Sequence, residues 1–245
     1  MFRQLPTSTH LIYVGFGFPE ETRKKQLISP QVSLLSISAE PHELLPEADM
    51  GFPPPSINAL TLTYQERLDI ETCASESLQS RPFLLSFIGH DRKGFSKREE
   101  LFKLHNDKDI IVMPTDAFHA KYQGKHTYDS VMRQSRYAAA PRGHSLFSYR
   151  FTEALSAGAI PIVQADNWVL PFRKELIDWS ECAIIVPEKD TIRTLDFIQN
   201  ITEEQQCRMR QRCYWIYQTY MANPEGEIAG AVDSLLAMDA AKNGT

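Results

Sequence analysis

The stretch YAAAPRGHSLFSYRFTEALSAGAIPIVQ, residues 137–164, decides the fold of this chain. Small apolar residues at 137–140 predict a strand, a Pro-Arg-Gly turn follows, and an amphipathic helix is expected over 146–157. Gly158 is expected to close that helix, and the apolar run 160–164 predicts a second strand. A strand, a helix and another strand of these lengths form a βαβ unit, in which the two strands lie parallel.

The same alternation continues on both sides of this unit. Strand-length apolar runs and helix-length amphipathic runs follow one another, with strands expected at 83–88, 110–113 and 183–186 and helices at 97–105 and 128–134. Short buried strands between helices are typical of a parallel sheet that is covered on both faces. The sequence therefore predicts an α/β fold, with a Rossmann-like parallel sheet and helices on both faces.

Two further strands, at 11–16 and 32–38, precede the stretch Gly-Phe-Pro-Pro-Pro at 51–55. Because consecutive prolines continue neither a helix nor a sheet, this stretch is expected to form a linker. The expected parts are an N-terminal part with the linker (1–55), a large α/β domain (56–226) and a C-terminal helix (227–245).

The end of the chain is predicted to be helical. Apolar residues recur at helical spacing over 192–201, and a second helix is expected over 203–220, with its aromatic residues, Trp215 among them, on the inner face. A last helix is expected from about 228 to 238, after a break at an Asn-Pro-Glu-Gly sequence.

Composition narrows the class of protein. The chain has 245 residues, a formal net charge of -5 and a pI near 5.8, whereas proteins that bind nucleic acid usually present a strongly basic face. No run approaches the roughly 20 apolar residues that span a bilayer. The 4 cysteines form no Cys-x-x-Cys pair and the 7 histidines no His-Glu-x-x-His motif, so we expect no zinc ribbon, no dense disulfide framework and no metal site. The cysteines leave the redox compartment open.

Ligands of open parallel sheets bind beyond the carboxyl ends of the strands, where loops lead into helices. The turn after the strand at 137–140 offers Arg142, Ser145 and Ser148, and the helix that follows presents the free N–H groups of its first turn. Because such a helix end carries partial positive charge, these groups together could hold a diphosphate.

Arg150 and Glu153 lie three residues apart on one flank of the same helix. One interpretation is a surface ion pair, which contributes little to stability. The other interpretation has Arg150 binding a phosphate while Glu153 accepts hydrogen bonds from ribose hydroxyls.

Two other loops hold candidate residues. Gly89, which follows the first strand of the large domain, would let the backbone approach a ligand, and Arg92 could neutralise a phosphate. The alternative is a solvated turn that leads into a basic helix start containing Arg98. Asp166 and Asn167 could contact a base or a sugar, although such residues after a strand are usually turn formers.

Several separated blocks keep a recognisable order and spacing. They are Pro-Arg-Gly at 141–143, SYRFTEAL at 148–155, GAIPIV at 158–163, Asn-Trp at 167–168, Leu-Pro-Phe at 170–172 and Ile-Asp-Trp at 177–179. In these blocks the sequence resembles the exostosins and the wider glycosyltransferase family 47. The resemblance runs from about residue 81 to about residue 221, and it departs from the family pattern at Ala138 and Ala159, where the family often has cysteines.

The resemblance implies a GT-B fold, meaning two Rossmann-like domains that face each other across a cleft, with a UDP-sugar held by the C-terminal domain, residues 56–226. It also implies inverting transfer to an oligosaccharide or polysaccharide acceptor, no cofactor, no obligatory metal, and a place in the Golgi membrane or lumen. A catalytic base is not assigned. With the residues singled out above, the expected donor-binding set is Gly89, Arg92, Arg142, Ser145, Ser148, Arg150, Glu153, Asp166 and Asn167.

Family members carry a membrane anchor and more of the first domain before the point where this chain begins. The resemblance therefore implies that residues 1–55 are the remnant of an acceptor domain, and that this chain binds UDP but transfers sugar poorly. Two alternatives remain open. One is a non-catalytic exostosin-like partner subunit or nucleotide-binding module, and the other is an unrelated Rossmann enzyme that uses a different nucleotide.

Overall fold

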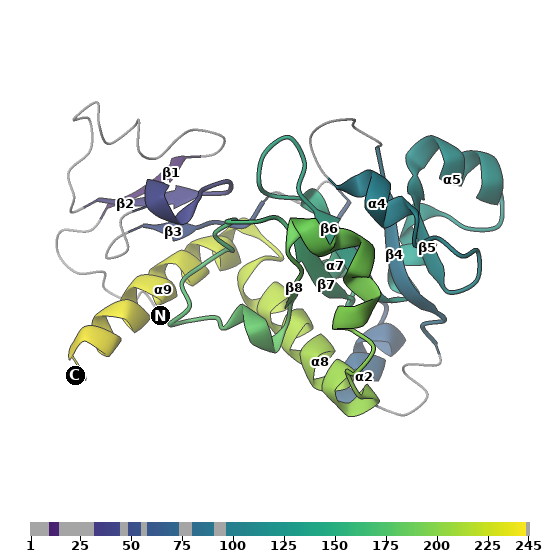
Figure 1. Cartoon of the computed structure of the whole chain (residues 1–245). Coiled ribbons are helices and arrows are strands. Elements are labelled where there is room, and N and C mark those ends of the chain that lie inside the picture. The colour runs from purple at the N-terminus through teal and green to yellow at the C-terminus, as the bar shows by residue number, and fades with distance from the viewer. Residues whose placement is uncertain are drawn as a thin grey trace.

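The computed structural model describes residues 10–14, 32–44, 49–54, 58–73, 80–90 and 97–243. Within these residues the chain forms two parallel sheets, which lie side by side in Figure 1. The three-stranded sheet has the order β1 (His10–Val14), β2 (Val32–Ser36), β3 (Met50–Gly51). The five-stranded sheet has the order β5 (Ile110–Pro114), β4 (Phe83–Gly89), β6 (Ser135–Pro141), β7 (Ile160–Gln164), β8 (Ile184–Ile185).

Helices cover both faces of the five-stranded sheet. The elements on one face are α4 (Arg98–Phe102) and η3 (Glu188–Phe197), and those on the other are α5 (Thr115–Tyr122), α6 (Tyr128–Arg133) and α7 (Tyr149–Ser156). Successive side chains of a strand point to opposite faces. Accordingly Tyr137 and Ala139 of β6 pack with Leu101 of α4, whereas Ala138 packs with Ala154 of α7. The predicted α/β fold with helices on both faces of a parallel sheet is confirmed.

The order of strands in this sheet determines where a ligand can bind. Strand β4 lies between β5 and β6, so the chain runs from β4 outward to β5 and then returns past β4 to form β6. The segment after β4 leads to α4 on one face, and the segment after β6 leads to α7 on the other. The two segments therefore diverge at the carboxyl ends of β4 and β6, which is the point where open α/β sheets bind ligands.

Two buried arginines hold the C-terminal end of α7. Arg81 donates to the carbonyl of Ser135 at 2.8 Å and to that of Ala157 at 2.7 Å, and Arg210 donates to the carbonyl of Gly158 at 3.2 Å. Cations at this end of a helix complement its dipole. Burial, followed by the nearby charge of Arg210, lowers the pKa of Arg81 well below its ordinary value. Gly158 has φ +67°, as expected of a glycine that closes a helix.

The segment between the two sheets is bound along α7. The hydroxyl of Thr152 donates to the carbonyl of Pro54 at 3.0 Å, and the hydroxyl of Ser156 accepts from the backbone N–H of Leu60 at 3.0 Å. Both α7 side chains are buried. Residue 58, which lies between these two attachment points, is thereby placed beside the helix.

Long helices and disulfides complete the structure. Helix α8 (Glu203–Tyr220) is linked by Cys73–Cys207 to the end of α2 (Tyr64–Thr72), and by Cys182–Cys213 to the segment before β8. Sequence spacing did not predict this pairing. Helix α9 (Pro224–Asn243) returns to the three-stranded sheet (Figure 1). There Leu235 packs with Leu35 and Met50. None of the helices in the described ranges is both long and apolar enough to span a bilayer.

Several expected boundaries are wrong. The sequence predicts a linker at 51–55, but Gly51 belongs to β3 and its carbonyl accepts from the N–H of Phe172 at 2.8 Å. A Cβ on Gly51 would lie 2.2 Å from the carbonyl oxygen of Leu170, so this close approach requires glycine. The helix expected from 146 begins at Tyr149, and the last helix begins at Pro224, because proline suits the first turn of a helix.

Trp215 does not pack on the inner face of α8. Its side chain is 47% exposed, whereas Cys213, Tyr217 and Tyr220 are buried. The three buried residues are spaced by four and three positions and therefore share one face of the helix, on which Trp215 does not lie. Of the segment expected to be helical at 192–201, residues 192–197 belong to the 3-10 helix η3, which ends at Phe197.

Candidate functional site

A cavity of about 490 Å³ lies at the carboxyl ends of β4 and β6, where the strand order reverses. Its walls come from the end of β4, the loop 143–147 after β6, the first residues of α7, the first residue of α4 and Asn58, which precedes α2. The lining residues are Asn58, Phe87, Gly89, His90, Arg98, Gly143, His144, Ser145, Phe147, Ser148, Tyr149 and Arg150. Sheet topology and cavity therefore indicate the same site.

Gly89, the last residue of β4, is buried and borders this cavity. A Cβ at this position would lie 2.5 Å from Cζ of Phe87, so the glycine allows the aromatic ring to pack directly under the strand end. The sequence-based expectation for Gly89 places it in the right cavity. Arg92, its expected partner, lies outside the described residues.

The first turn of α7 forms the opposite wall. Ser148 is the N-cap residue and is only 5% exposed, but its hydroxyl makes no capping hydrogen bond. The loop before it is closed by a hydrogen bond from the N–H of Gly143 to the carbonyl of Phe147, at 3.3 Å. Ser145 lines the cavity from this loop. Because the N-terminal end of a helix carries partial positive charge, this wall favours an anion.

Arg150 brings a full positive charge to the cavity. Its Nε donates to the carbonyl of Ile88 at 3.1 Å, its Nη1 is paired with Oε2 of Glu153, and its guanidinium lies 4.8 Å from the ring centre of Tyr128. The side chain is 23% exposed and lines the cavity. Contacts with β4, α6 and its own helix thus orient this guanidinium at the cavity wall.

Glu153 lies behind Arg150 in the protein interior and is 0% exposed. Its Oε2 also accepts from the hydroxyl of Tyr128 at 2.5 Å, and its Oε1 accepts from the side-chain amide of Asn58 at 3.3 Å. The interpretation of Arg150 and Glu153 as a surface ion pair is therefore wrong, because α7 packs against α6 and against the segment 58–60, and this packing buries the carboxylate. Glu153 does not line the cavity, so its contact with a ribose stays a prediction.

Arg142, Asp166 and Asn167 lie at the neighbouring carboxyl ends, those of β6 and β7. Nη1 of Arg142 is 3.6 Å from Oε1 of Glu188. Asp166 and Glu188 each accept, through a carboxylate oxygen, a hydrogen bond of 3.0 Å from the other's backbone N–H. Asn167 has φ +63°, which fits the turn-former interpretation. None of the three expected residues lines the cavity, and their part in donor binding stays a prediction.

Comparison with known proteins gives the family. The Exostosin GT47 domain matches residues 8–202. The chain belongs to the exostosin GT47 family. The predicted resemblance is thereby confirmed, and the cavity lies in the matched part of the chain.

Relatives in this family are considerably longer. The chain is 30% identical to Exostosin-1 of Drosophila melanogaster over 164 residues, which cover 60% of this chain and 21% of that protein. It is 29% identical to the Exostosin-1 homolog of Caenorhabditis elegans, covering 58% and 41%, and 28% identical to Exostosin-1b of Danio rerio, covering 54% and 20%. The matched part of the chain thus corresponds to less than half of each of these relatives.

Among solved structures there is a distant likeness to the pneumococcal O-GlcNAc transferase GtfA, in a crystal structure with UDP and GlcNAc. The TM-score is 0.28 and the identity 14%, over 85% of this chain and 42% of that chain.

Arg98 lines the cavity, although the sequence suggested for it only the alternative of a basic helix start after a solvated turn. One of its terminal nitrogens donates to the carbonyl of His90 at 3.0 Å and the other to the carbonyl of Arg142 at 3.1 Å, so it joins the ends of β4 and β6. Its guanidinium carbon also lies 5.3 Å from the ring centre of Phe87. A basic residue in the first turn of a helix opposes the helix dipole, and this mismatch is the sequence signal that could have identified it.

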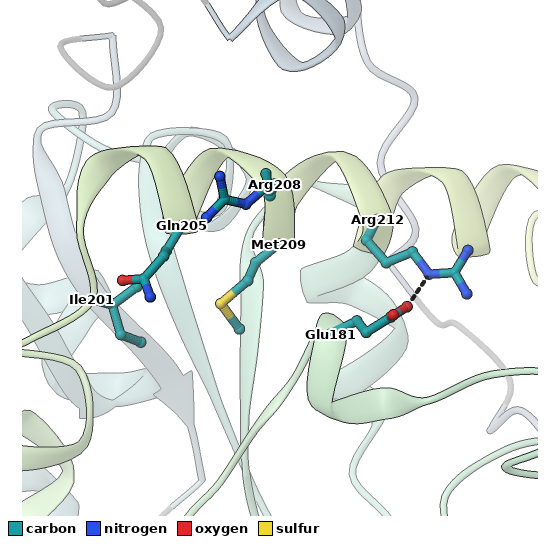
Figure 2. Close-up of a pocket in the computed structure, with 6 residues that line it drawn as sticks. All are labelled: Glu181, Ile201, Gln205, Arg208, Met209 and Arg212. Atoms are coloured by element: carbon teal, nitrogen blue, oxygen red, sulfur yellow. Dashed lines mark ion pairs between the residues drawn. The ribbon is translucent and has the colours of Figure 1, made fainter.

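A second hollow, of about 430 Å³, lies on α8 beside the turn at 179–181 (Figure 2). No strand end contributes to it. Of its three charged residues, Glu181 and Arg212 form an ion pair of 2.9 Å with each other, and Arg208 is paired with Glu204. The remaining lining residues are Ile201, Gln205 and Met209. Because its charged side chains are already paired with one another or with Glu204, this hollow has less to offer a charged ligand than the cavity at β4 and β6.

Proposed function

We propose that the cavity at the ends of β4 and β6 binds the diphosphate of a UDP-sugar, and that the chain is the donor-binding part of an exostosin-type glycosyltransferase. The observation that carries the proposal is that the guanidinium of Arg150 and the N-terminal end of α7 both line the cavity at the point where the strand order reverses. A volume of about 490 Å³ lies within the range of small-ligand pockets, about 300 to 1,000 Å³.

The groups around the cavity suit the chemistry of sugar transfer. In the proposed inverting reaction an acceptor hydroxyl attacks the anomeric carbon, and the bond from that carbon to the diphosphate oxygen breaks with its electron pair going to the diphosphate. The hydroxyl proton passes to a base that we do not assign. The guanidinium of Arg150, the N–H groups of α7 and the hydroxyls of Ser145 and Ser148 would stabilise the charge that grows on the departing diphosphate.

Ligand-dependent thermal unfolding tests the donor assignment. A ligand that binds only the folded state raises the melting temperature, so UDP and UDP-sugars are expected to raise it while GDP and NAD leave it unchanged. Stabilisation by NAD alone would instead favour an unrelated Rossmann enzyme. Transfer of radiolabelled sugar to an oligosaccharide then separates a catalyst from a non-catalytic partner subunit, which would bind UDP without turnover.

A location in the secretory pathway is part of the same proposal. Family membership suggests the Golgi membrane or lumen, and disulfides persist in such oxidising compartments. Peptide mapping without reductant should recover Cys73 linked to Cys207 and Cys182 linked to Cys213. Free thiols at all four positions in the native protein would argue against this location.

A further inference from the structure

We propose that Tyr128 is a positioning residue of the donor site, which fixes the guanidinium of Arg150 toward the diphosphate by holding Glu153 behind it. This inference rests on the proposed function of the cavity. Tyr128 itself does not line the cavity, so it would act on the ligand only through Arg150.

The hydrogen bonds of Arg150 leave one edge of its guanidinium for a ligand. A guanidinium has five N–H groups. Those on Nε and Nη1 donate to the carbonyl of Ile88 and to Glu153, while Nη2 donates to no acceptor in the part of the chain that the structure describes. Two in-plane contacts, through Nε and through Nη1, fix the plane of the guanidinium, and Nη2 is then available to a phosphate oxygen.

Glu153 can fix this plane only if it is itself held in place. A carboxylate that is 0% exposed is costly unless its oxygens accept several hydrogen bonds. The hydroxyl of Tyr128 donates to the same oxygen, Oε2, that pairs with Arg150, and the amide of Asn58 donates to the other. The ring of Tyr128 also lies 4.8 Å below the guanidinium carbon of Arg150. One side chain therefore contacts both halves of the ion pair.

The position of Tyr128 is in turn well defined. It is the first residue of α6, whose start is closed by a capping box: the hydroxyl of Thr127 accepts from the N–H of Ser130 at 3.1 Å, and the N–H of Thr127 donates to the hydroxyl of Ser130 at 2.9 Å. Burial, with the charge of Glu153 as a further cause, raises the pKa of Tyr128 above its ordinary value. The hydroxyl thus keeps its proton and remains a donor at any pH at which the enzyme would act.

The test compares ligands that differ only in phosphate. UDP, UMP and uridine are titrated calorimetrically into the wild-type chain and into Tyr128→Phe, which keeps the ring beneath the guanidinium but removes the hydroxyl. If Tyr128 positions Arg150, the affinity for UDP falls by about tenfold while that for uridine is unchanged, since the loss of a charge-assisted hydrogen bond has about this size. Tyr128→Leu, which also removes the ring, should lose more UDP affinity than Tyr128→Phe.

Tyr122→Phe is the matched control. The hydroxyl of Tyr122 donates to a carboxylate oxygen of Asp107 at 2.8 Å, so this tyrosine also serves a carboxylate, but it does so away from the cavity. Its removal should leave the affinity for all three ligands unchanged.

A double-mutant cycle tests whether Tyr128 acts on the ligand only through Arg150. In an Arg150→Ala background, Tyr128→Phe should cause no further loss of UDP affinity, because Tyr128 acts only through Arg150. The same cycle is made with Asn58→Ala, at an exposed position, and it reports on the hydrogen bond to the other oxygen of Glu153.

The outcomes separate the two proposals. A wild-type chain that binds no UDP overturns the proposed function and this inference with it. Wild-type binding of UDP together with equal binding by Tyr128→Phe overturns the inference alone. Equal losses for UDP and uridine, or full additivity with Arg150→Ala, would also overturn it, because they would show a general structural effect.

Discussion

The carboxyl ends of β4 and β6 and those of β6 and β7 form two neighbouring sites that differ in structure, although the sequence suggests ligand-binding residues at both. At the ends of β4 and β6, Arg150 faces a cavity of about 490 Å³, and its counter-ion Glu153 is buried behind it. At the ends of β6 and β7, Arg142 faces Glu188, which is bound to Asp166 through two backbone hydrogen bonds. At the first site the positive charge of Arg150 is available to a ligand. At the second site the charge of Arg142 is already compensated by Glu188.

Strand order explains this difference. The segments after β4 and β6 leave toward opposite faces of the sheet and part from each other, whereas β6 and β7 are consecutive neighbours within it. The sequence motif after β6 supplies two arginines, Arg142 and Arg150. Only the order of the strands tells which of the two borders the cavity. The two sites can therefore be compared by mutating the corresponding residue in each, first the two glutamates and then the two arginines.

The largest expected difference is in stability. Glu153→Ala removes the buried partner of Arg150 and the acceptor of Tyr128, and should lower the free energy of unfolding by about 3 kcal/mol, since removing one member of a buried ion pair leaves the other uncompensated. Glu188→Ala, at the partly exposed pair with Arg142, should cost less than about 1 kcal/mol. Urea unfolding of both variants measures the difference, and equal losses would mean that the two sites are equivalent.

The second difference is in affinity for the nucleotide. Arg150→Ala should weaken UDP binding by about 10-fold to 100-fold, the effect of one lost charge-assisted hydrogen bond. Arg142→Ala should weaken it by less than about threefold, because its guanidinium is directed to Glu188. Calorimetry on both variants decides between them. A larger effect for Arg142 would place the diphosphate at the ends of β6 and β7.

A smaller effect is expected from crowding the cavity wall. Gly89→Ala brings a methyl group to within 2.5 Å of the ring of Phe87, which must then shift, at a cost of about 1 to 2 kcal/mol in stability. Gly143 lines the same cavity, but a Cβ at this position would lie 3.6 Å from its nearest neighbour, the carbonyl oxygen of Phe147. Gly143→Ala should therefore have little effect on stability. Thermal unfolding of the two variants checks this contrast. Equal melting temperatures would show that Phe87 is free to move.

Local sequence patterns predicted the elements that bury a continuous apolar stripe. Strands β4 and β7 and helix α8 match their expected ranges to within a residue. Helix α2 was not predicted, because only Ile70 among its residues is buried and there is no stripe to detect. Gly51 was taken for a linker residue because its pairing in β3 and its contact with Leu170 involve residues distant in the sequence.

The residues of the candidate site likewise fall into those that the sequence could identify and those that it could not. Ser148 and Arg150 belong to a single motif around one helix start, so one stretch of sequence was sufficient to name them. Asn58, Arg98 and Tyr128 reach the site from the segment before α2, from α4 and from α6, and only the folded chain brings them together. The burial of Glu153 was likewise invisible, since the segment that covers it lies 95 residues away.

The smallest expected effect is that of a chelator. We expect EDTA to leave the affinity for UDP unchanged within about twofold, because the cavity carries its own positive charge in Arg150 and the first turn of α7. No group of three or more His, Cys, Asp or Glu side chains that could hold a metal occurs in the ranges that the structure describes. At the second site Asp166 and Glu188 already accept hydrogen bonds from each other's backbone, so a divalent ion there would have to displace them. UDP is titrated calorimetrically into chain treated with EDTA and into chain supplied with manganese or magnesium. A strict manganese requirement would show that the diphosphate is neutralised by a metal rather than by Arg150, and would move the donor site toward the carboxylates at the ends of β7 and β8.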